Sequence, residues 1–108
     1  MTWEVVTEPE VTDWYLGLSG DDRDVVAERI DLLANLGHML RMPHVRPLGR
    51  GLVELRFDMS RRSWRITYWH RTDGVIVLLT VFHKRRDNEA REVDRARRAL
   101  EACQTGHI

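Results

Sequence analysis

The chain has 108 residues, of which 43% are hydrophobic, and its 17 basic and 17 acidic residues give a formal net charge of zero. This length predicts one domain spanning residues 1–108, and the hydrophobic fraction excludes a disordered chain. The single cysteine, Cys103, excludes an internal disulfide. The longest uncharged apolar run, residues 75–82, is too short to cross a bilayer, and no signal peptide is visible, so we expect a cytoplasmic protein without membrane contact.

The charges are distributed unevenly along the chain. Residues 1–40 contain nine acidic and two basic residues, whereas residues 41–108 contain fifteen basic and eight acidic ones. The two parts therefore have formal charges of −7 and +7. Such an imbalance indicates a polyanion as the partner of the basic part. The alternative is that the two parts attract each other in the folded chain.

The first third of the chain predicts a strand followed by two helices. Residues 3–6 (WEVV) are aromatic and β-branched, which is typical of a strand. Thr7–Glu10 and Ser19–Asp22 match the capping-box pattern that begins helices. Apolar residues spaced by three or four positions follow each box, so we expect two amphipathic helices that form a hairpin and end near Gly37.

Residues 38–51 contain two prolines and two glycines and are expected to form a loop. After this segment the apolar residues recur with period two. Residues 52–58 and 63–71 each alternate between apolar and polar positions, as strands with one buried face do.

The dipeptide Asp73-Gly74 indicates a type I′ turn into an uninterrupted apolar strand at residues 75–82. A strand without alternation is buried on both faces and should be central. A charged helix is predicted from Asp87 onward. The predicted fold class is therefore α+β, in the order β-α-α-β-β-β-α, with a small, mainly antiparallel twisted sheet and the helices packed on one side.

The expected strand register brings three cations to one face of the sheet. If Asp58 pairs with Ser63, Arg56 lies directly opposite Arg65. The type I′ turn then places Lys84 opposite Ser63, on the same face. Opposed like charges destabilise a sheet by up to about 1 kcal/mol. A sequence that keeps them either neutralises the charge or uses it to hold an anion.

The sequence alone does not decide between neutralised cations and an anion-binding site. Glu54 and Asp58 are available as surface ion-pair partners, and a basic run after a strand is often simply solvated. The alternative is phosphoryl transfer on RNA, in which attack by a 2′-hydroxyl builds negative charge that guanidinium groups stabilise. Lys84, crowded by cations, or His83, on the opposite face, would then exchange protons. The histidines have no metal-ligand spacing, so we expect neither metal nor cofactor.

Four segments resemble the HigB-like branch of the RelE/ParE toxin superfamily, which includes phage-derived members of bacterial toxin–antitoxin pairs. They are Leu48-Gly49, Glu54-Leu55-Arg56, Arg65 and Phe82-His83-Lys84-Arg85. The resemblance implies a RelE-like fold and a metal-independent, ribosome-dependent mRNA endoribonuclease (an mRNA interferase) that inhibits translation. It also implies two partners, a HigA-like antitoxin with a helix-turn-helix domain and mRNA on the ribosome.

The same resemblance implies that Arg56, Arg65 and Lys84 act as catalytic residues on the scissile phosphate. Five further residues are predicted to bind RNA, namely His83, Arg85, Arg86, Arg50 and Trp69. Two other functions suit the same sequence, a ParE-like toxin that inhibits DNA gyrase and an RNA-binding protein without catalysis. The convergence of three cations favours the nuclease, because a gyrase inhibitor has no phosphorane to stabilise.

Overall fold

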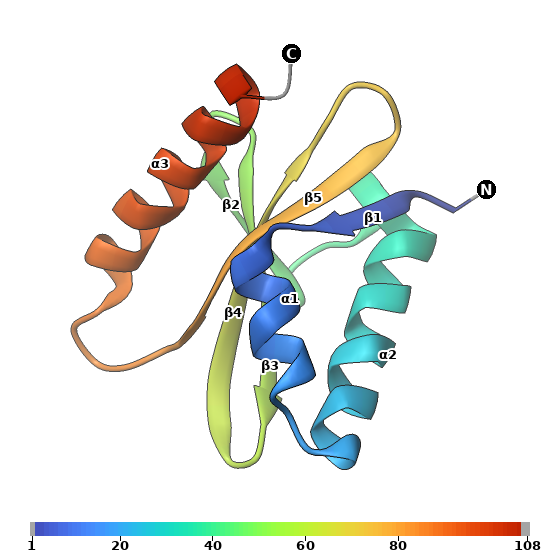
Figure 1. The fold of residues 1–108 in the computed structure, drawn as a ribbon, viewed down its shortest axis with the longest axis vertical. Coiled ribbons are helices and arrows are strands. Elements are labelled where there is room, and N and C mark those ends of the chain that lie inside the picture. Colours follow the sequence, from blue (N-terminus) through green and yellow to red (C-terminus); the bar gives the residue numbers. More distant parts are fainter. Residues whose placement is uncertain (1, 107–108) are drawn as a thin grey trace.

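The structure, a computed structural model, describes residues 2–106. A five-stranded sheet in the order β1-β5-β4-β3-β2 forms its centre (Figure 1). The strands are β1 (Glu4–Thr7), β2 (Val45–Gly49), β3 (Leu52–Met59), β4 (Arg62–His70) and β5 (Val75–His83). The helices are α1 (Pro9–Leu16), α2 (Gly20–Leu36) and α3 (Glu89–Gly106), with a short 3-10 helix, η1, at Gly37–Met39. No helix among residues 2–106 has the length and apolar character needed to cross a membrane.

The predicted α+β class and the mainly antiparallel sheet are confirmed. In the described part of the chain β1 and β5 pair in parallel, and the other three strand pairs are antiparallel. The predicted loop at residues 38–51 is wrong in part, because β2 lies within it. β2 is an edge strand, where Pro47 removes no hydrogen bond that a neighbouring strand needs, and its register shifts between Pro47 and Gly49.

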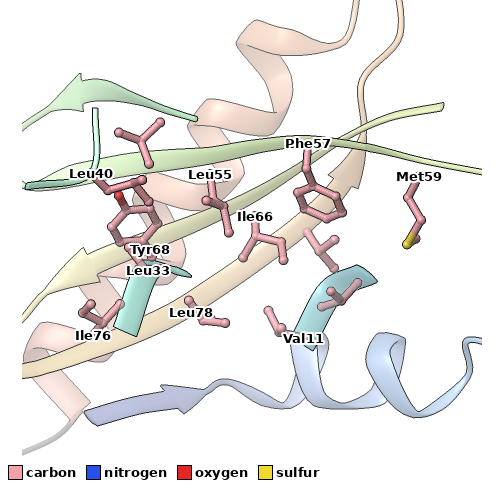
Figure 2. Packing of buried hydrophobic residues seen from close by; sticks show 13 residues of the cluster. Val11, Leu33, Leu40, Leu55, Phe57, Met59, Ile66, Tyr68, Ile76 and Leu78 are labelled. Carbon is pink, nitrogen blue, oxygen red and sulfur yellow. The ribbon is translucent and has the colours of Figure 1, made fainter. Parts of the chain in front are cut away.

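The helices cover both faces of the sheet, so the expectation that all of them pack on one side is wrong for α3 (Figure 1). The larger core lies between the sheet and the α1–α2 pair and includes Val11, Leu33 and Tyr68 (Figure 2). On the other face, α3 packs Ala96, Leu100 and Cys103 against Leu52, Val75, Val77 and Leu79. The physical reason is that β5 is apolar at every position from Val75 to Phe82 except Thr80, so each of its faces requires a covering layer.

The two predicted capping boxes have different outcomes. Ser19 caps α2, and its hydroxyl accepts a hydrogen bond from the Asp22 backbone at 3.2 Å. Thr7 instead belongs to β1, and Glu8 occupies the cap position of α1, which its side chain does not cap. The carboxylate of Glu10 is then available to the sheet, where it accepts a hydrogen bond from the Val81 backbone at 2.9 Å.

The predicted register between β3 and β4 is confirmed. Arg56 pairs with Arg65, and Asp58 pairs with Ser63. The turn between these strands has only two residues, Ser60 and Arg61, with φ values of 51° and 64°. Two successive positive φ angles are the signature of a type I′ turn, whose twist matches that of the flanking strands.

The β4–β5 hairpin differs from the prediction at its turn and agrees with it at the other end. Instead of a two-residue turn, residues 71–74 connect the two strands, and the Arg71 amide donates to the Val75 carbonyl at 2.8 Å. A register shift after Thr67 compensates for this difference. The Lys84 amide consequently donates to the Ser63 carbonyl at 2.8 Å, so Lys84 lies opposite Ser63 as predicted.

A buried hydroxyl pair stabilises the register shift. The hydroxyls of Thr67 and Thr80 lie 2.6 Å apart, and Thr67 also accepts from the Thr80 amide at 3.2 Å. We predict that Thr67→Val lowers the free energy of unfolding by about 1 to 3 kcal/mol, because it keeps the side-chain shape and removes the buried partner. Urea unfolding measures this loss, and Thr72→Val in the exposed turn is the control. Equal stability of the two variants would contradict the prediction.

Candidate functional site

A hollow of about 380 Å³ opens at the edge of the sheet, beside the part of β3 that β2 leaves unpaired. Pairing between β2 and β3 ends at Leu55, and beyond it the Arg56 amide donates to the His44 carbonyl at 2.8 Å. The hollow is therefore bounded by the loop before β2, by β3 and β4, and by α2. Its lining residues are Arg29, Pro43, His44, Arg56, Phe57, Asp58, Ser63 and Arg65.

Arg65 is the most firmly fixed cation in this hollow. Its side chain is only 10% exposed, and its Nη1 donates to the Trp64 carbonyl at 2.9 Å. Its Nε lies 3.5 Å from Oε1 of Glu54. Burial lowers the pKa of Arg65, and the nearby Arg56 guanidinium lowers it further. Such a buried group is held in one position, which is what preorganised stabilisation of an anion requires.

Glu54 lies under the two arginines and is completely buried. Its Oε1 is 3.9 Å from the Arg56 Nε, and among the described residues neither carboxylate oxygen accepts a hydrogen bond from an N–H or hydroxyl group. Burial raises the pKa of Glu54 to about 7, and the neighbouring Glu89 carboxyl at the start of α3 adds to this effect, whereas Arg65 and Arg56 oppose it. Glu54 therefore offsets the opposed arginines only in part near neutral pH.

Lys84 lies at the border of this hollow. Its backbone is bonded to Ser63, which lines the hollow, whereas its ammonium group donates to the Arg85 carbonyl. The structure thus brings Arg56 and Arg65 together and places Lys84 next to them with its amine turned to the chain's own backbone.

His83 and Arg85 lie together at a second hollow of about 330 Å³. The imidazole of His83 packs beside Trp64 with a centroid separation of 5.6 Å, on the sheet face opposite Arg65, as predicted. Burial lowers the pKa of His83, with smaller contributions from Arg62 and Arg85. The buried Asn88 shapes this corner, because it accepts from the Arg85 amide at 2.9 Å and donates to the His83 carbonyl at 2.8 Å. The neighbouring Arg86 is exposed.

The remaining two predicted RNA-binding residues lie away from both hollows. Arg50 is exposed in the turn between β2 and β3, where its φ is 55°. Trp69 pairs with Leu52 and packs against the apolar cluster under α3. The contacts of Trp69 are those of a half-buried core residue. Neither Arg50 nor Trp69 lines the hollow that contains Arg56 and Arg65.

Sequence reasoning missed Arg29, His44 and Glu89. A signal existed for Arg29, which follows the buried Val26 by three positions and precedes the buried Leu33 by four. A cation on the core-facing stripe of a helix must lie at the rim of the core or meet a polar site. His44 carried no comparable signal, because a loop between two prolines has no periodicity to place its side chains.

The fold is RelE-like. The structure of the free E. coli toxin RelE, carrying two arginine-to-alanine substitutions, superposes with a TM-score of 0.65 over 94% of this chain and 97% of that chain, at 14% sequence identity. One chain of the toxin–antitoxin complex RelBE2 from Mycobacterium tuberculosis gives a TM-score of 0.59 over 78% of this chain and 100% of its own length, at 18% identity.

A sequence family covers most of the chain as well. Residues 13–101 match the family described as phage derived protein Gp49-like (DUF891), and the chain belongs to this family. No curated protein sequence matches the chain significantly. The predicted phage-derived family and the predicted RelE-like fold are thereby confirmed.

Proposed function

We propose that this protein is the toxin of a type II toxin–antitoxin system and that it cleaves mRNA as a HigB-like endoribonuclease. The observation that carries the proposal is the pair Arg56 and Arg65, opposed across β3 and β4 and lining one hollow with a third arginine, Arg29. The RelE-like fold and the toxin–antitoxin complex among the similar structures support it.

The proposed chemistry follows from the charges in the hollow. Attack by the 2′-oxygen of RNA on the adjacent phosphorus increases the negative charge on the non-bridging oxygens. Arg65 is positioned to stabilise that charge by its burial and its bond to the Trp64 carbonyl, and Arg56, whose side chain is 32% exposed, supplies a more mobile donor. In this proposal the guanidinium groups take the role that a metal ion has in other nucleases.

The proposed partners are mRNA on the ribosome and an antitoxin with a HigA-like helix-turn-helix domain. The charge of +7 in residues 41–108 suits a polyanionic substrate. Most acidic residues of the N-terminal part lie on α1 and α2, which cover the sheet face away from Lys84, and the exposed sides of these helices offer a surface to a protein partner.

Mapping of RNA 5′ ends across the transcriptome after brief induction in a bacterial host tests the proposal. We expect new ends inside coding regions, in phase with codons, for wild type and none for Arg65→Ala. Growth arrest with intact RNA would instead indicate a ParE-like inhibitor of DNA gyrase. RNA binding that persists without any new ends would indicate an RNA-binding protein that does no catalysis.

A further inference from the structure

Among residues 2–106, His44 supplies the one imidazole that lines the arginine-lined hollow. The loop that carries His44 is fixed by two backbone bonds, from the His44 amide to the Arg41 carbonyl at 3.0 Å and from the Arg56 amide to the His44 carbonyl at 2.8 Å. The second bond ties His44 directly to the strand that carries Arg56. The His44 side chain is exposed and lines the hollow, so it is accessible to a bound substrate.

The other candidates for moving a proton are less suitable. Asp58 lines the hollow, but its carboxylate accepts a hydrogen bond from the Ser63 hydroxyl at 3.0 Å. The Lys84 ammonium donates to the Arg85 carbonyl, and a protonated amine has no lone pair to accept a proton. His83 lies on the opposite face beside Trp64. His44 is thus the accessible lining side chain that carries an imidazole, the group most often used to move protons in catalysis.

We propose that His44 accepts the proton of the attacking 2′-hydroxyl and that Arg29 is a third guanidinium donor to the phosphate. This inference rests on the proposed endoribonuclease function and specifies its substrate as a phosphodiester with a neighbouring 2′-hydroxyl. The charged groups that line the hollow with His44 come from three elements, Arg29 from α2, Arg56 and Asp58 from β3, and Arg65 from β4.

The step balances in atoms and protons. The 2′-oxygen forms a bond to phosphorus, and its proton passes to the imidazole of His44. The bond between phosphorus and the 5′-oxygen breaks, which leaves a 2′,3′-cyclic phosphate. The departing 5′-oxygen takes one proton from solvent, and the imidazolium later returns one to solvent. No proton, electron or co-reactant is consumed overall.

The test is the pH dependence of single-turnover cleavage of mRNA on programmed ribosomes. For wild type we expect a rate that rises with pH, because only the unprotonated imidazole can accept a proton. His44→Gln should slow cleavage about 100-fold or more and remove this rise, because glutamine keeps the polarity and accepts no proton. His38→Gln is the matched control, because His38 stacks on His70 with a centroid separation of 3.8 Å and does not line the hollow.

Arg29→Ala tests the second half of the inference. We expect the apparent dissociation constant of the Arg29→Ala variant for the mRNA-bound ribosome to be about tenfold higher than that of wild type. Arg98→Ala, an exposed arginine on α3, should bind like wild type. Thermal unfolding of each variant shows whether the fold is retained. A rise with pH that persists in a folded His44→Gln variant would overturn the role of His44, and unchanged binding by Arg29→Ala would overturn that of Arg29.

The experiments distinguish failure of the endoribonuclease function from failure of the role of His44. If wild type cleaves no RNA on or off the ribosome, the endoribonuclease proposal itself is wrong. If wild type cleaves and His44→Gln cleaves with the same pH dependence, the nuclease is retained and only the assignment of its proton acceptor is lost.

Discussion

Replacing Arg65 by lysine is expected to slow mRNA cleavage about 100-fold, although the charge is conserved. The Arg65 guanidinium uses one nitrogen to bond the Trp64 carbonyl and another to face Glu54, and the rest of its planar group remains available to a phosphate. A lysine ammonium is a point donor on a flexible stem and cannot make these contacts simultaneously. Rates of single-turnover cleavage on programmed ribosomes measure the effect.

Arg98→Lys is the control for this substitution, because Arg98 is exposed on α3. Its cleavage rate should equal that of wild type. Since lysine still carries a positive charge opposite Glu54, the Arg65→Lys variant should unfold within a few degrees of wild type. A cleavage rate within threefold of wild type would show that only the charge at this position matters, and that the geometry of the guanidinium does not.

The convergence of Arg56 and Arg65 was predictable from sequence because it depends on a short-range pattern. Alternation with period two fixes which side chains share a face, and the two-residue turn at Ser60 and Arg61 fixes the register a few residues away. The prediction for Lys84 came out right although the predicted β4–β5 turn was wrong, because the longer loop and the register shift after Thr67 compensate for each other.

The features that sequence reasoning missed depend on tertiary contacts. β2 contains a proline and a glycine, and it is a strand only because the edge of β3 supplies partners for its backbone. α3 has an apolar stripe that could pack against either face of the sheet, so its sequence does not specify which face it covers. His44 and Arg29 meet at the hollow across a loop and a helix, which no local periodicity relates.

Glu54 illustrates the same limit within one strand. The alternation in β3 gives it the same face as Arg56, which suggests a surface ion pair. Its complete burial follows from the position of α3, whose first turn brings Glu89 beside it. Glu54, which the sequence suggests as a solvated ion-pair partner, is therefore a buried acid. Its burial has a measurable effect on the stability of the protein.

Glu54→Gln is expected to stabilise the protein at alkaline pH and to leave it nearly unchanged at acidic pH. Burial raises the pKa of Glu54 from 4.5 to about 7, so the folded protein binds this proton more strongly than the unfolded chain does. Protonation of Glu54 makes its full contribution to the free energy of unfolding below pH 4.5, and this contribution is lost as the pH rises through about 7. By linkage the loss amounts to about 3 kcal/mol in the free energy of unfolding.

Urea unfolding at about pH 5 and about pH 8 measures this loss. The stability of Glu54→Gln relative to wild type should increase by about 2.5 kcal/mol between the two pH values, because glutamine is neutral at both. Glu101→Gln, at an exposed position on α3, should keep the pH dependence of wild type. The same pH dependence in wild type and Glu54→Gln would mean that Arg56 and Arg65 stabilise the carboxylate enough to cancel its burial. In that case the arginines would be fully paired within the protein, and they would have much less charge to offer a phosphate.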